Sequence, residues 1–225
     1  MPARRSSLWR NRDFNVFWLG QTLSVLGGSI TLLAMPLLVL EATRSVVQMG
    51  LITVVTGVTG IATGLFAGHV VDRTDRRRLM IACDLSRALL LGAVPLIWLA
   101  GPRIWVLYVL TALATALKTL FDVAYVTAVP ELVPAEDLTA ANGRLMGTFA
   151  VGTLCGPAAA GFIAAGVGAD WALGVDGATF LVSAASLRWV TFGRHGDPER
   201  SAAGRRGAQP PPYGAARGGG VFVVG

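Results

Sequence analysis

The sequence has little charge: Asp, Glu, Lys and Arg make up 14% of its 225 residues, whereas 53% are hydrophobic. Its mean hydropathy of +0.60 is too high for a water-soluble domain of this length, which needs more charge to cover its surface. Only two cysteines and two histidines are present. No CxxC pair or Cys–His spacing occurs, so no metal site is expected and Cys83 and Cys155 are interpreted as packing residues.

The sequence also lacks the motifs of ATP hydrolysis and metal catalysis, because it contains neither a GxxxxGK[ST] phosphate loop nor an HExxH pair. A net charge of +6 is compatible with nucleic-acid binding. However, the basic residues lie in short blocks beside apolar runs and lack interleaved aromatic residues. We therefore expect no enzyme activity, no cofactor and no nucleic-acid partner.

Apolar runs dominate what is present, and each is close to the length of about 20 residues that crosses a bilayer as a helix. The six runs cover residues 14–40, 49–71, 79–100, 104–128, 145–166 and 172–192. Helices are expected because a lipid-facing backbone must satisfy its own hydrogen bonds, and the runs lack the alternation of barrel strands. The sequence predicts an all-α membrane protein with a six-helix transmembrane bundle over residues 14–192.

Basic residues predict the orientation, since cytoplasmic connections carry an excess of Lys and Arg. Two blocks should therefore be cytoplasmic: Arg4, Arg5, Arg10 and Arg12 before the first span, and Arg73, Arg76, Arg77 and Arg78 in the second connection. The first and third connections, with Arg44 and Arg103, should face outward. The fourth connection, residues 130–142, is acidic and is the weakest part of the pattern. We expect a multi-pass protein of the cell membrane with residues 1–13 and both termini in the cytoplasm.

The composition changes at residue 193, after which 13 of the 33 remaining residues are Gly or Pro. No hydrophobic periodicity remains in residues 193–225, which predicts a disordered tail. The Arg, Gly, Ala and Pro content also resembles the product of a GC-rich gene read in a shifted frame.

The second connection has the most informative pattern, Gly68-His-Val-Val-Asp72-Arg73-Thr-Asp75-Arg76-Arg77-Arg78. It is too short to fold alone, so it should dock against other helices. A carboxylate such as Asp72 can pair with an arginine or with a helix N-terminus, and a sliding motion can make or break that contact. The alternative is that these arginines only anchor the orientation.

This pattern resembles the loop between helices two and three of the major facilitator superfamily, in which a glycine is followed by three residues, Asp-Arg and a basic run. The resemblance implies a twelve-helix transporter built from two six-helix halves, and a conformational gate at this loop. Asp75 replaces a glycine of the general pattern, as in the branch of siderophore and macrolide exporters. The residues that match are Gly68, Asp72, Arg73, Arg76 and Arg77.

A second segment, Gly152-Thr-Leu-Cys-Gly156-Pro157-Ala-Ala-Ala-Gly161, is similar to the glycine-proline motif of antiporters in this superfamily. Pro157 removes a backbone hydrogen bond and the glycines let another helix approach, which predicts a kink or a seal. A kink without a function is the alternative. The resemblance covers residues 8–190 in all, and includes Asp176 in the sixth span.

Ionisable residues inside the spans are candidates for function because a charge within a bilayer is costly. Asp84 and Arg87 are three residues apart, and Lys118 and Asp122 four, so each pair can meet on one helical face. We expect an internal structural pair for Asp84 and Arg87. For Lys118 and Asp122, a lining or proton-coupling role and a purely structural role are weighed equally.

Three further features are interpreted as structural or left open. Gln21 can bind a substrate or, more commonly, a neighbouring helix. Asp176 is expected in a solvated position near the outer interface. Close helix approach is predicted for the glycines of the second span, Gly57, Gly60, Gly64 and Gly68. Generic bundle packing and a special mobility of this helix are weighed equally as its purpose.

These observations favour the N-terminal half of a proton-driven exporter of drug-like or siderophore-like compounds, truncated after the sixth helix. Its expected partners are the lipid bilayer, a small-molecule substrate, protons or another coupling ion, and a second six-helix half. A homodimeric half-transporter is one alternative. A non-transporting membrane scaffold or inactive fragment is the other.

Overall fold

The structure, a computed structural model, describes residues 11–101 and 103–190, and these stretches contain helices and no strand. The long helices are α1 (Arg12–Thr43), α2 (Val46–Asp72), α3 (Arg76–Gly92), α5 (Ile104–Leu132), α6 (Leu138–Val167) and α7 (Ala169–Trp189). A short helix, α4 (Val94–Leu99), follows α3, and one turn of 3-10 helix, η2 (Ala135–Asp137), precedes α6. The described chain is therefore all-α, as predicted.

Each of the six predicted spans corresponds to helix, with α3 and α4 together forming the third. The break at Ala93 falls where Pro95, in the first turn of α4, has no N–H to donate to the preceding turn. Among the described residues, five segments are long and apolar enough to cross a membrane: α1, α2, α3 with α4, α5, and η2 with α6. The sixth, α7, has 21 residues and carries Asp170, Asp176 and Arg188, which lower its hydropathy.

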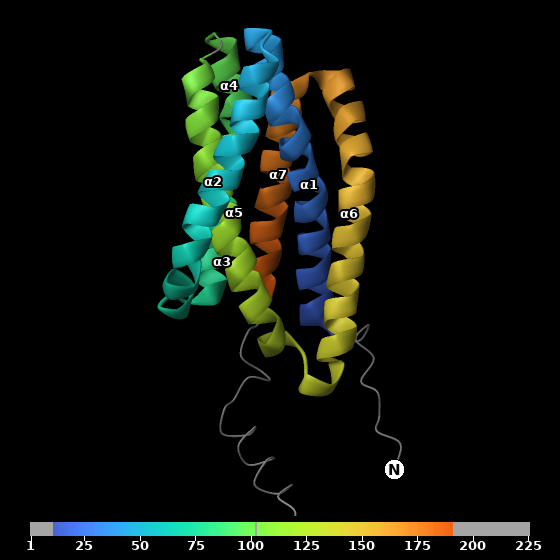
Figure 1. Ribbon diagram of the computed structural model, residues 1–225. Coiled ribbons are helices and arrows are strands. Elements are labelled where there is room, and N and C mark those ends of the chain that lie inside the picture. Colours follow the sequence, from blue (N-terminus) through green and yellow to red (C-terminus); the bar gives the residue numbers. More distant parts are fainter. Residues whose placement is uncertain (1–10, 102, 191–225) are drawn as a thin grey trace, which may run out of the picture. The chain divides into compact units, whose positions relative to one another are not determined.

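The one long helix missing from these five segments, α7, is also the most central in the packing. Figure 1 shows the long helices running side by side, and α7 packs against both α1 and α3. On the far side of α1 lies α6, while α5 packs against α3 and α2. Because α7 is covered by protein on two sides, it can carry polar residues that a lipid-facing helix cannot.

Two clusters of buried apolar side chains fill the described helices, and a polar layer separates them. One cluster includes Phe17, Cys83 and Leu187. The other includes Ile30, Ala88 and Phe180. Between them along α1, α3 and α7 lie the buried polar residues Gln21, Ser24, Asp84, Arg87 and Ser183.

The connections are shorter than predicted. The fourth contains only Val133 to Asp137, because α5 continues through Pro130 to Leu132 and α6 starts at Leu138. A single residue, Gly168, joins α6 to α7. Its φ of +92° lies in the region that glycine adopts without steric cost, and its N–H bonds to the carbonyl of Ala164 at 2.9 Å.

The glycines of α2 do not make the close approaches that we predicted. A Cβ added at Gly57 or Gly68 meets nothing within 4 Å, and at Gly60 and Gly64 it makes only ordinary contacts with α5. The physical reason is that α2 lies at one side of the described helices, where only Ile52, Ala67 and Val71 of its 27 residues are buried. Its glycine face is exposed.

Candidate functional site

The second connection begins where α2 ends at Asp72, and α3 follows Asp75 directly. The Asp75 side chain accepts a hydrogen bond from the backbone N–H of Arg78 at 2.8 Å, and so caps the N-terminus of α3. A carboxylate is favourable there because the first N–H groups of a helix lack partners and carry partial positive charge. The departure from the superfamily glycine thus has a local structural effect that the sequence comparison alone did not indicate.

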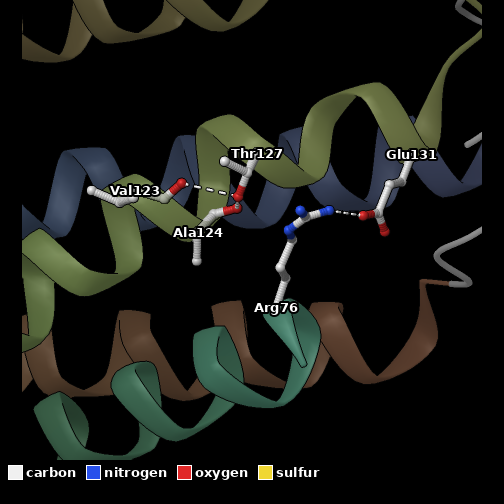
Figure 2. Close-up of polar contacts among 5 residues, drawn as sticks. All are labelled: Arg76, Val123, Ala124, Thr127 and Glu131. Atoms are coloured by element: carbon white, nitrogen blue, oxygen red, sulfur yellow. Dashed lines mark hydrogen bonds and ion pairs between the residues drawn. The ribbon is translucent and has the colours of Figure 1, made fainter. Parts of the chain in front are cut away.

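The next two arginines tie this end of α3 to two other helices. Arg76 forms an ion pair with Glu131, near the end of α5, as Figure 2 shows. On the same helix, Thr127 donates its hydroxyl to the carbonyls of Val123 and Ala124. Arg77 donates through Nε to the carbonyl of Leu187 at 3.0 Å, and through a second nitrogen to the next carbonyl of α7.

Arg77 satisfies groups that have no partner within their own helix, because the last carbonyls of α7 accept no intrahelical bond. Its positive charge also lies at the negative end of the α7 dipole. The connection is therefore docked against α5 and α7, and does not project freely from the described helices.

Asp72 is exposed and differs from its neighbours in having no local partner. It forms no hydrogen bond or ion pair with a residue that the structure describes, and it ends α2, where the helix dipole is negative. It lines an open cavity of about 400 Å³ with Thr74, Asp75, Arg76, Arg77 and Glu131. Arg73 and Gly68 are exposed nearby and do not line this cavity.

Deeper in α3, Asp84 and Arg87 are both buried, but they do not form the expected ion pair. Neither carboxylate oxygen of Asp84 has a hydrogen-bond partner within 3.5 Å among the described residues. The guanidinium carbon of Arg87 lies 3.7 Å from the centre of the Phe180 ring on α7. Arg87 thus turns toward an aromatic face, a favourable partner for a desolvated cation, and Asp84 acts on it only at longer range.

Asp176 is fully buried, which corrects the expectation of a solvated position near the outer interface. The hydroxyls of Thr31 on α1 and Thr179 on α7 donate to its carboxylate. The cause is the central position of α7, whose face toward α1 meets neither lipid nor water. Gly27 provides the space, since a Cβ there would overlap Thr179 and Asp176.

Sequence reasoning missed the burial of Asp176. The available signal was the pair Gly27 and Thr31, four residues apart and therefore on one face of α1. Gln21, on the same helix, donates to the Ser183 hydroxyl at 3.4 Å, so its partner is the neighbouring helix.

Lys118 and Asp122 form an ion pair along α5, and both side chains are about half exposed. Lys118 lines a second cavity, of about 220 Å³, enclosed by α1, α2, α3 and α5. Arg87 also lines it, and these two are its only charged lining residues. The remaining lining is apolar or carries threonine hydroxyls, including those of Thr56 and Thr111.

The glycine-proline segment of α6 packs closely on α1. A Cβ at Gly152 would lie 2.5 Å from Val25, and one at Gly156 would overlap Ser29. The Ser29 hydroxyl donates to the Gly152 carbonyl at 3.3 Å. The helix continues through Pro157, while Gly161 makes only an ordinary contact with α1.

The cysteines differ in their surroundings, because Cys83 is buried in the apolar core and Cys155 is exposed on α6. The packing interpretation therefore describes Cys83 and not Cys155. Across residues 11–101 and 103–190, no three His, Cys, Asp or Glu side chains cluster as metal ligands.

Comparison with known proteins gives two findings. The family model described as Major Facilitator Superfamily matches residues 17–224. A curated protein of Mycolicibacterium fortuitum described as multidrug efflux pump Tap is 28% identical over 181 residues, which cover 78% of this chain and 44% of that protein. The chain thus spans less than half the length of this relative.

Proposed function

This chain belongs to the Major Facilitator Superfamily, and from that premise we propose that it forms the N-terminal half of a proton-driven exporter of drug-like or siderophore-like compounds. The Mycolicibacterium relative is described as an efflux pump, which supports this direction of transport. An ion gradient is the proposed energy source because the sequence has no phosphate loop.

The observation that carries the proposal is the cavity between α1, α2, α3 and α5, with charged groups at membrane depth. Arg87 and Lys118 line it. The carboxylates of Asp84 and Asp176 do not line it, but they act electrostatically on Arg87. Charges inside a bilayer are costly and mark substrate or ion pathways. Lys118 with Asp122, or the carboxylates of the buried layer, are the proposed coupling groups.

The second connection is proposed as a cytoplasmic latch. Arg76 and Arg77 hold α3 against α5 and α7, whereas Asp72 presents an unpaired carboxylate to the open cavity. When the cytoplasmic side is closed, Asp72 would pair with a cation or a helix N-terminus of the second half. The close packing of Gly152 and Gly156 on α1 is the proposed seal or bending point of the same motion.

The second half is proposed to cover the exposed face of α2. Alternating access requires two bundles that move against each other, so a six-helix unit needs a partner. That partner is either a C-terminal half or a second copy of this chain. The protein is proposed to lie in the cell membrane. Residues 1–13 and both termini are proposed to lie on its cytoplasmic side.

Reconstitution in proteoliposomes tests the transport proposal. With ethidium as the probe and a pH-sensitive dye inside the vesicles, we expect proton movement that depends on the addition of ethidium. Vesicles without protein give the baseline. No ethidium-dependent proton movement would favour the scaffold or inactive fragment, and crosslinking that yields only monomers in membranes would exclude the homodimer.

A further inference from the structure

Two buried side chains that line the 220 Å³ cavity have donor groups without partners. Arg87 is 6% exposed and Thr111 is 7% exposed, and neither the Arg87 Nε nor the Thr111 hydroxyl forms a hydrogen bond in the described part of the chain. Buried polar groups in folded proteins are nearly always paired, with protein, water or a ligand. The two residues that carry these donors line one cavity, from two different helices, α3 and α5.

The other threonine hydroxyls of this cavity have visible partners. Thr31 donates to Asp176, and Thr56 donates to the carbonyl of Ile52 at 3.1 Å. Leu32, Met35 and Leu91 supply apolar wall. An apolar wall with a few convergent polar groups is the usual composition of a small-molecule site, in which the polar groups fix orientation.

The charges around the cavity favour a neutral group over an anion. Asp122 neutralises Lys118, and the carboxylates of Asp84 and Asp176 both act on Arg87. Neither of those two aspartates lines the cavity. The wall therefore offers hydrogen-bond donors with no surplus of positive charge. A ligand carboxylate would bind there no more tightly than a neutral carbonyl group.

We propose that Arg87 and Thr111 form a subsite that binds the carbonyl oxygen of a neutral ester, lactone or amide group of the substrate. The subsite deepens the proposed function and rests on it. Phe180 holds the guanidinium in place by its ring face, so that Arg87 is oriented before the ligand arrives. The volume of about 220 Å³ is smaller than the roughly 300–1,000 Å³ of a complete drug-sized site, so one functional group occupies it.

Rhodamine 123 and rhodamine 110 test the subsite because they share a ring system and differ as methyl ester and free acid. Binding is measured by fluorescence anisotropy with the complete chain in lipid nanodiscs. Thr111→Val keeps the shape and removes the hydroxyl, and should weaken rhodamine 123 binding about fivefold, the value of one hydrogen bond. Thr119→Val is the matched control on the same helix, because the Thr119 hydroxyl is already bonded to the Thr115 carbonyl at 3.0 Å and Thr119 does not line the cavity. It should leave the affinity unchanged.

Three results would overturn the subsite: unchanged rhodamine 123 affinity in Thr111→Val, an equal loss for rhodamine 110, or no rhodamine 123 binding by the unaltered chain. A thermal midpoint lowered more by Thr111→Val than by Thr119→Val would also overturn it, because the Thr111 hydroxyl would then serve the fold. Rhodamine 123 binding that depends on Thr111, without any proton-linked export, would support the subsite and contradict the proposed function.

Discussion

Two carboxylates three positions apart, Asp72 and Asp75, lie at opposite kinds of helix end. Asp75 caps the N-terminus of α3, where partial positive charge favours it, and Asp72 ends α2, where partial negative charge opposes it. The same side-chain chemistry is therefore stabilising at one position and locally unfavourable at the other. An unfavourable, exposed carboxylate is available for a partner that the described residues do not provide.

Asp75→Ala should destabilise the protein by about 1 kcal/mol, the usual cost of losing an N-cap. Unfolding in mixed detergent, followed by circular dichroism, measures the change. Asp75→Asn is the control, because an asparagine oxygen still accepts the bond from the Arg78 N–H. Equal losses for both substitutions would contradict the capping role.

Asp72→Asn, in contrast to Asp75→Ala, should not destabilise the protein. Removing the charge from the C-terminus of α2 should leave stability unchanged or raise it by about 0.3 kcal/mol, while ethidium-dependent proton movement falls. Membrane insertion should be normal. Transport equal to that of the unaltered chain would remove the latch assignment.

The charged residues within the spans show where helical spacing correctly predicts a contact and where it does not. Helical spacing placed Lys118 and Asp122 within reach of each other, and they pair. The same rule put Asp84 beside Arg87, but Arg87 instead contacts the ring of Phe180, which is distant in sequence. Spacing within one helix reports which groups can meet, whereas partners on other helices decide which do.

At the scale of the helices, glycine has two different effects that the sequence does not distinguish. Glycines recur in α2 and in α6 at similar spacing, yet of these only Gly152 and Gly156 of α6 lie very close to another described helix. The difference comes from position in the packing: α6 lies against α1, while α2 presents most of its surface outward.

Gly156→Ala and Gly57→Ala therefore form a matched pair. The first places a methyl group on Ser29 and should destabilise the packing of α1 on α6 by about 1–3 kcal/mol. The second adds a methyl group in open space and should be neutral or stabilising by about 0.5–1 kcal/mol, the helix preference of alanine over glycine. Detergent unfolding compares them, and equal effects would contradict the packing described for α6.

The contact of Arg77 with the end of α7 gives a further expectation about a single helix. Arg77→Gln should weaken the end of α7 by about 1 kcal/mol, since charge-assisted bonds to two helix-terminal carbonyls are lost. Hydrogen exchange should accelerate in the last turn of α7. Arg78→Gln, at an exposed position in the same block, should leave that exchange rate unchanged.

At the scale of the whole molecule, composition and apolar runs predicted the fold class and six helical segments, because bilayer thickness constrains both length and hydrophobicity. They did not predict which faces pack inward, since helices such as α1 and α2 are apolar on all sides. The centrality of α7 and the burial of Asp176 thus emerged only from the packing. The predicted tail, residues 193–225, lies outside the described residues.

Orientation also belongs to this scale and is testable by labelling. With Cys155→Ser as the background, Thr74→Cys and Arg103→Cys place single reactive thiols in the second and third connections. A membrane-impermeant maleimide added outside intact cells should label the Arg103 position and spare the Thr74 position. Labelling of both from the same side would overturn the six-span arrangement.

Gly168 is the only residue that connects α6 to α7. The two backbone torsions of Gly168 therefore set the angle between these helices. Both helices pack against α1. A change in the torsions of Gly168 would therefore alter the packing of three helices, α1, α6 and α7, at once.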